Sequence, residues 1–309
     1  MEKKTVSKKP AFTIVELLTV MSVIALLIGL LVPALSLVQD HARELKQRAQ
    51  FHSIQVGIDM FVAEAGYGTY PPSSENAISN DPWADPAPYG GAQKLAEALV
   101  GYDLLGYHPE SSFRSDGLTT DSSVTPPQIV PAYPASPTRR DLEQRVGPFI
   151  DLENANAFKI GDVYRNYGAL NPDNYVLCDV FAKRRHSGKK TGMPILYYRA
   201  RTEWYDQSWD SPSVPAPANM PGGIEDDIYY YPDNFQILDL GMPEDPSVRH
   251  DLADGVTDLR DFEEMILNPQ IPRNTLRRPY RAGSYILISA GKDGRFGTAD
   301  DITNFNKKE

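Results

Sequence analysis

The feature that most constrains this chain is a long apolar run near its N-terminus that contains one acid. From Phe12 to Val38 the only charged residue is Glu16, and the run is longer than the roughly 20 apolar residues that cross a bilayer as a helix. Charged groups are costly inside a bilayer, and those that occur there usually have a partner or a function. The run therefore predicts a membrane-spanning helix, and Glu16 is the residue within it that needs an explanation.

The charges that flank the run predict its orientation. Residues 1–11 contain four lysines and a single acid, Glu2. Because basic flanks stay on the cytoplasmic side, we expect the leader to remain in the cytoplasm and the chain after Val38 to be exported. The sequence thus predicts a protein with one membrane pass and its C-terminal part outside.

Two plainer interpretations of the run remain open. A secretory signal would be cut after the apolar stretch, where Ala34-Leu35-Ser36 offers small residues, although a signal core rarely runs this long or starts with an acid. A plain membrane anchor needs no acid near its cytoplasmic end, but a glutamate there can reach the interface at modest cost. Neither interpretation requires Glu16.

The pattern resembles the class III signal of type IV pilins and type II secretion pseudopilins. In that family a short basic leader is removed just before a phenylalanine, and the fifth residue of the mature chain is glutamate. A cut between Ala11 and Phe12 makes Glu16 the fifth residue, and Pro33 falls where the family has its helix-kinking proline. The family normally has glycine before the cut, where this chain has Ala11.

The resemblance implies how the chain is processed and assembled. Prepilin peptidase would cut after Ala11 and methylate the new amino terminus of Phe12, and Glu16 would pair with the terminus or with Thr13 of a neighbouring subunit. An ion pair that forms only between subunits makes the buried charge a penalty for the monomer and a gain for the filament in correct register. The implied partners are prepilin peptidase, other pseudopilin subunits in a homo- or heteropolymer, and the inner-membrane assembly platform.

The helical pattern continues beyond the apolar run. Residues 39–65 contain no proline, place apolar residues along one face and carry charges on the opposite face, which predicts an amphipathic helix. One helix bent at Pro33 is therefore predicted from Thr13 to Ala65. Its end and the following Gly68-Thr69-Tyr70-Pro71 turn also resemble the major pseudopilins.

These patterns predict four parts in an α+β chain. They are a cytoplasmic leader (1–11), a transmembrane and polymerisation helix (12–38), its amphipathic continuation (39–65) and an enlarged globular head (66–309). The resemblance implies a pilin-like fold in which the long helix packs on an antiparallel β-sheet head. It also implies a single-pass protein of the inner membrane with a periplasmic head, which enters a filament after assembly.

Charge and cysteine content narrow the function further. Removing the leader takes away four lysines and one acid and changes the net charge from −10 to −13, which argues against nucleic acid as the main partner. The lone Cys178 has no second cysteine to form an internal disulfide, unlike the cysteine pair of many type IV pilins. Another device must hold the C-terminal part together.

A loop near the C-terminus is the candidate for that device. Residues 289–302 follow a strand-like run and bring three acids and three glycines together, and Ca²⁺ prefers such hard oxygen ligands in a tight turn. The loop is not an EF-hand, and an ordinary solvated β-turn remains open. It resembles the calcium loop of major pseudopilins, which implies a structural Ca²⁺ held by Asp293, Asp300 and Asp301 with the carbonyls of Ala290 and Thr298.

The resemblance covers residues 11–75 and 280–305 and leaves the middle of the chain unmatched. Two proline-rich stretches, 126–137 and 212–221, are predicted to be surface loops. Short β-branched and aromatic runs predict strands at 195–200, 228–231 and 235–238, and apolar spacing predicts helices at 93–105 and 258–266.

The sequence gives no enzymatic signature. The five histidines form no HExxH pair, and neither a G-x-S-x-G elbow nor a phosphate loop occurs. The polar run 249–255 is interpreted as a loop, and the aromatic run 204–210 as packing rather than a ligand surface. We therefore predict a structural subunit of a type II secretion pseudopilus. A type IV pilin for adhesion or motility, a membrane-tethered extracytoplasmic binding protein and an exported hydrolase remain as alternatives.

Overall fold

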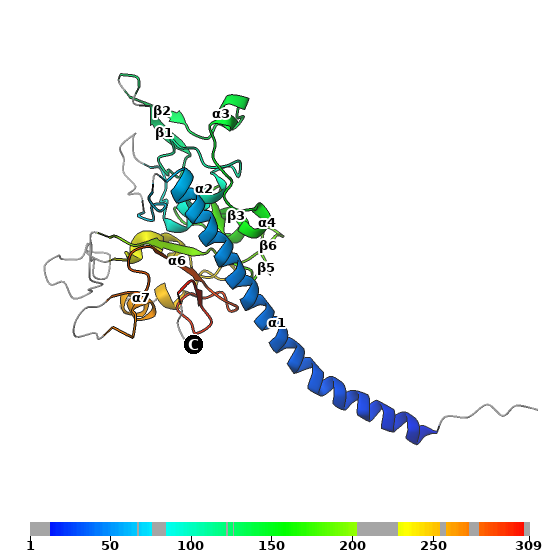
Figure 1. The fold of residues 1–309 in the computed structure, drawn as a ribbon. Helices are drawn as coiled ribbons and strands as arrows, with labels where there is room; N and C mark the ends of the chain where they lie inside the picture. The colour runs from blue at the N-terminus through cyan, green and yellow to red at the C-terminus, as the bar shows by residue number, and fades with distance from the viewer. Residues whose placement is uncertain are drawn as a thin grey trace, which may run out of the picture. The chain divides into compact units, whose positions relative to one another are not determined.

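A single helix, α1 (Ile14–Glu64), forms the N-terminal part of the structure (Figure 1). The computed structural model describes residues 13–305 except 67, 76–84, 122, 126, 203–227, 254–257 and 272–277. The chain divides into two units, Met1–Leu45 and Lys46–Glu309, so the boundary lies inside α1. The predicted helix of residues 13–65 is confirmed to within one residue at each end.

The part of α1 in the first unit exposes its apolar side chains. Its apolar window is long enough to cross a membrane, and none of that window is buried. Because an apolar helix surface of this length is unfavourable in water, it needs a cover of lipid or protein. The helix of the first unit could therefore span a membrane.

In the second unit, α1 packs through one face. Phe51, Ile54, Ile58 and Phe61 are buried, whereas the residues between them, apart from the buried Gly57, are exposed or half-buried. The spacing of three and four residues is that of an amphipathic helix. The compact unit thus begins at Lys46, within the segment predicted as the amphipathic continuation.

The other helices are short. The α-helices are α2 (Gly91–Val100), α3 (Arg139–Glu143), α4 (Leu152–Ala155), α5 (Ile160–Val163), α6 (Phe235–Asp239) and α7 (Asp258–Ile266), and the 3₁₀ turns are η1 (Tyr231–Asn234) and η2 (Asp251–Ala253). Every residue of α2 is buried. A Cβ at Gly91 would lie 2.1 Å from the carbonyl oxygen of Tyr197, so only glycine lets this helix approach the neighbouring strand so closely.

The described strands form small antiparallel sheets. They pair as β1 (Leu118–Asp121) with β2 (Gln128–Pro131), β3 (Ala157–Lys159) with β4 (Tyr175–Leu177), β5 (Lys183–Arg184) with β6 (Lys190–Thr191), and β7 (Leu196–Arg199) with β8 (Tyr285–Ser289) and β9 (Ile302–Thr303). The fold is therefore α+β, with a long apolar N-terminal helix and antiparallel sheets.

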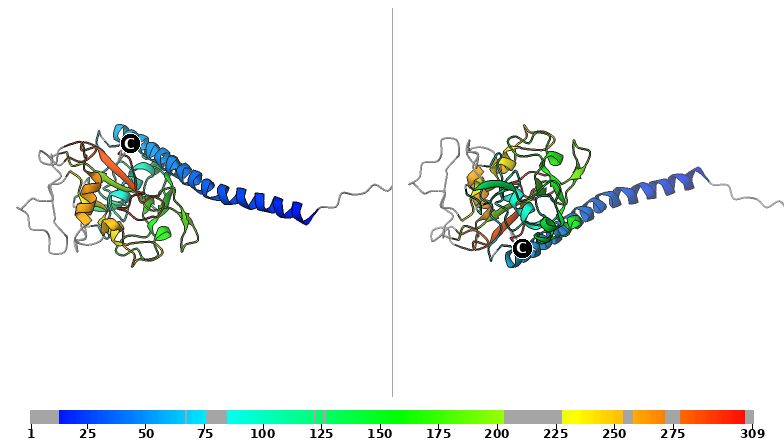
Figure 2. Two further views of the ribbon diagram at one scale, coloured as in Figure 1. Left: turned by 90° about the horizontal axis from the view of Figure 1, so that it is seen from below. Right: turned by 90° about the horizontal axis from the view of Figure 1, so that it is seen from above.

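The β7–β8–β9 sheet separates two cores. Side chains alternate between the faces of a strand, so Tyr197 and Leu287 join the core that contains Ile54 and Ile58 of α1. Tyr198 and Ile286 point to the other core, which contains residues of α6 and α7. Figures 1 and 2 show α7 on the side of the sheet away from the C-terminal half of α1. The sheet thus pairs strands that are far apart in sequence, and a separate hydrophobic core packs against each of its faces.

Several predicted elements differ from the structure. Residues 228–230 form no strand, and residues 235–238, predicted as a strand, form α6. A four-residue β-branched and aromatic run has weak intrinsic preference, and Pro232 near the start of η1 favours a helical turn that begins at this position. Helix α2 ends at Val100 because Gly101 takes a positive φ of 85°.

The remaining predictions have mixed outcomes. The helix predicted at 258–266 is confirmed as α7, and the strand predicted within 195–200 as β7. The proline-rich stretch 126–137 is not only a loop, because it contains β2. The second proline-rich stretch, 212–221, and the aromatic run 204–210 lie outside the described residues.

Candidate functional site

The N-terminal end of α1 is closed by a capping box. Both the backbone N–H and the hydroxyl of Thr13 donate to Oε2 of Glu16 at 2.9 Å, and the Glu16 N–H donates to Oγ1 of Thr13 at 3.2 Å. This reciprocal arrangement satisfies N–H groups that the first helical turn leaves open. Ala11 and Phe12, the predicted processing site, lie outside the described residues.

Within one subunit, the capping box gives Glu16 hydrogen-bond partners. Sequence reasoning took Glu16 as an acid without a partner in its own chain, although T-x-x-E is a recognised N-terminal helix signal. The structure gives Glu16 hydrogen bonds from Thr13 of the same chain but no ion pair with a cation of residues 13–305 as described. Its polar atoms are partly satisfied, whereas no residue in the described ranges neutralises its negative charge.

The rest of the apolar run keeps its polar groups within the helix. The hydroxyl of Thr19 donates to the Glu16 carbonyl at 3.0 Å, and that of Ser22 donates to the Leu18 carbonyl at 2.8 Å. The helix continues through Pro33. Such internal bonding is what a helix surrounded by lipid requires.

Two glutamines dock α1 onto the globular unit. Gln50 Nε2 donates to the carbonyl oxygen of Cys178 at 2.9 Å and to that of Asn154 at 3.2 Å, and the Val180 N–H donates to Gln47 Oε1 at 2.9 Å. Both glutamines are buried. No sequence signal indicates this role, because glutamine on an amphipathic helix is usually exposed.

A buried carboxylate lies next to this docking site. Asp179 accepts hydrogen bonds from the Phe181 N–H at 3.1 Å, the Met193 N–H at 3.2 Å and the Ser289 hydroxyl at 3.0 Å. Burial raises the pKa of Asp179 to about 7, although these hydrogen bonds act in the opposite direction. Asp179 therefore links the segment that contacts α1, residues 178–180, to Ser289, which directly precedes the C-terminal acidic loop.

The C-terminal acidic loop, residues 290–301, folds back on itself. Asp300 Oδ2 accepts from the Asp293 N–H at 2.9 Å, and Asp301 Oδ2 accepts from the Gly297 N–H at 2.8 Å. A Cβ at Gly291, whose φ is 63°, would lie 2.2 Å from the Asp300 carbonyl oxygen, so the closure of the loop requires glycine. Lys183 Nζ donates to the Asp293 carbonyl at 2.9 Å.

This loop brings some of the predicted metal ligands together. The Asp300 carboxylate accepts from the Asp293 N–H, and partial burial together with the neighbouring Asp300 charge raises the pKa of Asp293. Partial burial alone would raise the pKa of Asp300, but hydrogen bonds from Thr298 and the Asp293 N–H lower it. Ala290 is buried and Thr298 is half-buried.

The five predicted ligands do not form a complete metal cage. In the described part of the chain no three His, Cys, Asp or Glu side chains converge as around a metal ion. Asp301 is turned to the Gly297 N–H rather than to Asp293. The donor chemistry, two neighbouring carboxylates on a tight turn with backbone carbonyls, is of the hard-oxygen kind that Ca²⁺ prefers.

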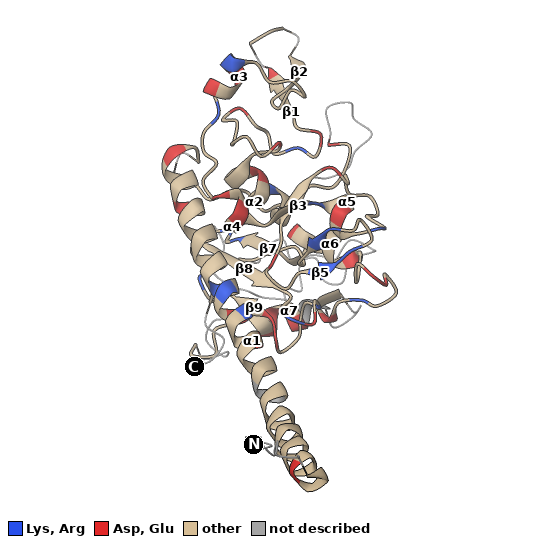
Figure 3. Cartoon of the chain, turned by 90° about the vertical axis from the view of Figure 1, so that its right-hand side faces the viewer, with Lys and Arg blue, Asp and Glu red and all other residues tan. Residues whose placement is uncertain are grey.

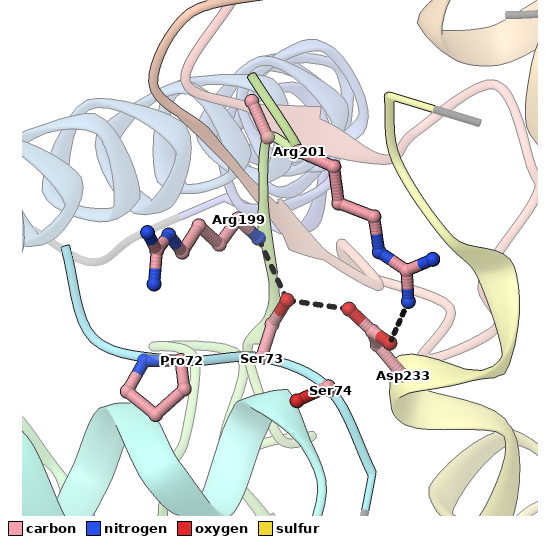
Figure 4. Close-up of a pocket in the computed structure, with 7 residues that line it drawn as sticks. Pro72, Ser73, Ser74, Arg199, Arg201 and Asp233 are labelled. Carbon is pink, nitrogen blue, oxygen red and sulfur yellow. Dashed lines mark hydrogen bonds and ion pairs between the residues drawn. The ribbon is translucent and has the colours of Figure 1, made fainter. Parts of the chain in front are cut away.

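A small cavity lies at the end of β7. It has a volume of about 210 Å³ and is lined by Pro72, Ser73, Ser74, Arg199, Ala200, Arg201 and Asp233 (Figure 4). The Ser73 hydroxyl donates to Asp233 and accepts from the Arg199 N–H at 3.0 Å, while the Arg201 guanidinium lies 3.8 Å from Asp233. Burial raises the pKa of Asp233 to about 6.

The groups in this cavity do not form a hydrolytic triad. The lining residues include no histidine that could link a hydroxyl to a carboxylate. The Ser73 hydroxyl instead closes the outer edge of β7 through the Arg199 N–H (Figure 4). The Ser73 hydroxyl therefore makes a structural contact with β7.

Comparison with known protein families, with functionally characterised proteins and with solved structures found no match to this chain.

Proposed function

We propose that this chain is a membrane-anchored, pilin-like filament subunit. The observation that carries the proposal is α1, one uninterrupted helix whose first part is apolar enough to cross a membrane and whose second part lies in the core of an α+β unit. Such a helix can leave the bilayer and enter a polymer without refolding. Within this class we propose the major pseudopilin of a type II secretion system, processed by prepilin peptidase.

The state of Glu16 explains why the filament would form in one register. Within a subunit, Thr13 satisfies hydrogen bonds of the carboxylate but supplies no positive charge. Cleavage after Ala11 would create an amino terminus at Phe12, four residues before Glu16, and a neighbouring copy would bring such a terminus to the carboxylate. A buried charge that is paired only in the polymer disfavours wrong registers.

The acidic loop supports a structural Ca²⁺ in the same proposal. Asp293 and Asp300 lie side by side with like charges, and a cation between them would relieve their repulsion. Asp293, Asp300, Asp301 and the carbonyls of Ala290 and Thr298 would hold the ion. It would fix the C-terminal turn of a chain whose only cysteine, Cys178, is buried.

Three substitutions separate the charge of Glu16 from its capping role. Glu16→Gln keeps a hydrogen-bond acceptor for the cap but removes the charge, Glu16→Leu removes both, and Thr13→Val keeps the charge but removes the hydroxyl. We expect all three chains to insert into the membrane. Glu16→Gln and Glu16→Leu should fail to enter filaments in cells that carry the secretion system, whereas Thr13→Val should enter them in part.

The filament fraction is measured by shearing and immunoblotting, with the membrane fraction as the control for insertion. Incorporation of Glu16→Gln at the wild-type level would contradict the assembly role of the charge. A membrane-tethered binding protein would be insensitive to all three changes. A type IV pilin for adhesion or motility would show the same sensitivity but would support surface fibres instead of protein secretion.

A further inference from the structure

The β5–β6 hairpin concentrates positive charge in an acidic protein. Residues 183–190 contain five of the 31 lysines and arginines and no acid, while the whole chain carries a net charge of −10. All of these basic side chains except Arg185 are exposed. Basic residues gather at β5 in Figure 3. Such a local excess of one charge produces a field that attracts an anionic partner.

The hairpin is held rigid by its one buried arginine. Arg185 donates to Thr191 Oγ1 at 3.2 Å and to the Gly192 carbonyl at 3.4 Å, and it forms an ion pair with Glu244. Because these contacts fix the backbone, the neighbouring cations are presented in a defined arrangement. A preorganised surface loses less conformational entropy when it binds.

Within the described ranges of the subunit, the two cations at the centre of the hairpin have no ion-pair partner. Arg184 and Lys190 lie directly opposite each other in the β5–β6 register. Like charges directly opposite each other destabilise a strand pair. In the described part of the chain neither makes an ion pair, whereas Lys189 pairs with Asp162 at 2.8 Å. Arg165 and His186 extend the same surface along a cavity of about 280 Å³.

A surface of opposite character lies beside α1 in the same globular unit. A groove of about 370 Å³ is lined by His52, Ser53, Val56, Met60, Pro148, Phe149, Ile150, Asp151 and Asn154. The side chains of Val56 and Met60 are 44% and 42% exposed, so the groove has an apolar wall open to a partner. Among the described residues, no cation pairs with the exposed carboxylates of Asp59, Asp151 or Glu153.

We propose that the β5–β6 hairpin of one copy of this chain docks into the α1 groove of the next copy. The inference rests on the proposed filament function and names one contact within it. The aliphatic stems of Arg184 and Lys190 would cover Val56 and Met60, and their charged ends would reach Asp151 and Glu153. This pairing neutralises charge on both surfaces at once.

The geometry of this contact favours an open polymer. The hairpin and the groove share no residue, so each copy can use both surfaces at the same time. A contact between two different surfaces is heterologous, and unless it closes into a ring it continues through successive copies. It would also offset the repulsion between subunits that each carry the same negative net charge.

Zero-length cross-linking tests the contact in the full-length protein. Unlabelled and ¹⁵N-labelled chains are mixed in non-ionic detergent, and a carbodiimide joins lysine amines to carboxylates that touch. We expect peptides that link Lys189 or Lys190 of one isotope to Asp151 or Glu153 of the other. Raising the salt from about 0.05 M to about 0.5 M should reduce these links, because it screens exposed charges.

Charge reversal tests the same contact by association. Arg184→Glu/Lys190→Glu keeps a like-charged pair at the same register, so the hairpin should be as stable as before while association weakens at least tenfold. Adding Asp151→Lys/Glu153→Lys to this chain should restore association. Arg139→Glu/Arg140→Glu, on exposed α3, is the matched control and should leave association unchanged.

The outcomes separate this inference from the proposed function. Filaments that depend on Glu16 but show no hairpin-to-groove links, and no effect of the double reversal, would overturn the inference alone. A wild-type chain that stays monomeric at every salt concentration, and that enters no filament in cells, would overturn both. Links from the hairpin to a different acidic surface of a second copy would overturn the assignment of the groove.

Discussion

Asp179 is the residue at which burial and hydrogen bonding act most directly against each other. Three donors surround its carboxylate and favour the charged form, but removal from water raises its pKa from 3.8 to about 7. Between these two values the folded protein binds a proton that the unfolded chain does not. By linkage, the contribution of Asp179 to stability is fully present below pH 4 and is lost as the pH rises through 7.

Asp179→Asn should remove this pH dependence. The amide cannot titrate, so wild type should gain stability relative to the variant as the pH falls from 8 to 5, with a slope of up to about 1.4 kcal/mol per pH unit. Urea unfolding of both proteins at several pH values measures the difference. Parallel pH profiles of the two proteins would contradict a raised pKa at this position.

At the scale of elements, α1 serves two environments with one continuous backbone. Its first part exposes apolar side chains, and its second part is fixed by an apolar stripe and by two buried glutamines, Gln47 and Gln50. The glutamines give the docking a defined register, because each must reach particular backbone groups of residues 154–180. Apolar contacts alone would allow more sliding.

Gln50→Ala should weaken the docking of α1. The change leaves the buried carbonyl of Cys178 and the part-buried carbonyl of Asn154 without this donor and should cost about 1–3 kcal/mol of the free energy of unfolding. Gln55→Ala is the matched control, since this half-buried glutamine is on the same helix and alanine is at least as good a helix former. Equal stability of the two variants in thermal melts would refute the docking role.

The acidic loop is an element whose stability should depend on calcium. If Asp293 and Asp300 share an ion, Ca²⁺ at about 100 times its dissociation constant should stabilise the fold by about 2.7 kcal/mol. Asp300→Asn should abolish the increase in melting temperature, whereas Asp245→Asn, in a turn where the Asp245 carboxylate accepts hydrogen bonds from Ser247, should retain it. Calorimetry should detect one site, and the absence of heat would leave the loop as an ordinary turn.

At the scale of the whole molecule, a pilin-like subunit needs two units with different surroundings. It also needs one proteolytic cut that removes the leader. A cut after Ala11 places a new positive charge at Phe12, near the only acid of the apolar run. It would also remove four lysines and one acid, which makes the mature chain more acidic. Under the proposal, processing would supply the counter-charge that the described chain does not give Glu16.

The N-terminus of the native protein should therefore be methylated Phe12. Intact mass measurement and Edman degradation of protein from membranes distinguish the possibilities. An intact Met1 would indicate a plain anchor, and a chain that begins near Leu37 would indicate a secretory signal. Either result would remove the basis for filament assembly.

Sequence alone determined the elements whose signals are long and local. The helix of residues 14–64 follows from its apolar run and amphipathic spacing, and the strand of residues 285–289 from a buried β-branched run. The Thr13–Glu16 cap could also have been predicted, because all of its parts lie within one turn. In each case the determining contacts are close together in the chain.

Only the tertiary structure decided the features that depend on residues far apart in sequence. Residues 235–238 form a helix because of their packing in the core, Gln47 and Gln50 become buried because residues 154–180 lie across α1, and Asp179 meets Ser289 across 110 positions. The pairing of β7 with β8 has the same origin. Propensity and spacing describe a residue's neighbours along the chain, whereas burial and hydrogen bonding here are set by neighbours that only the folded chain brings together.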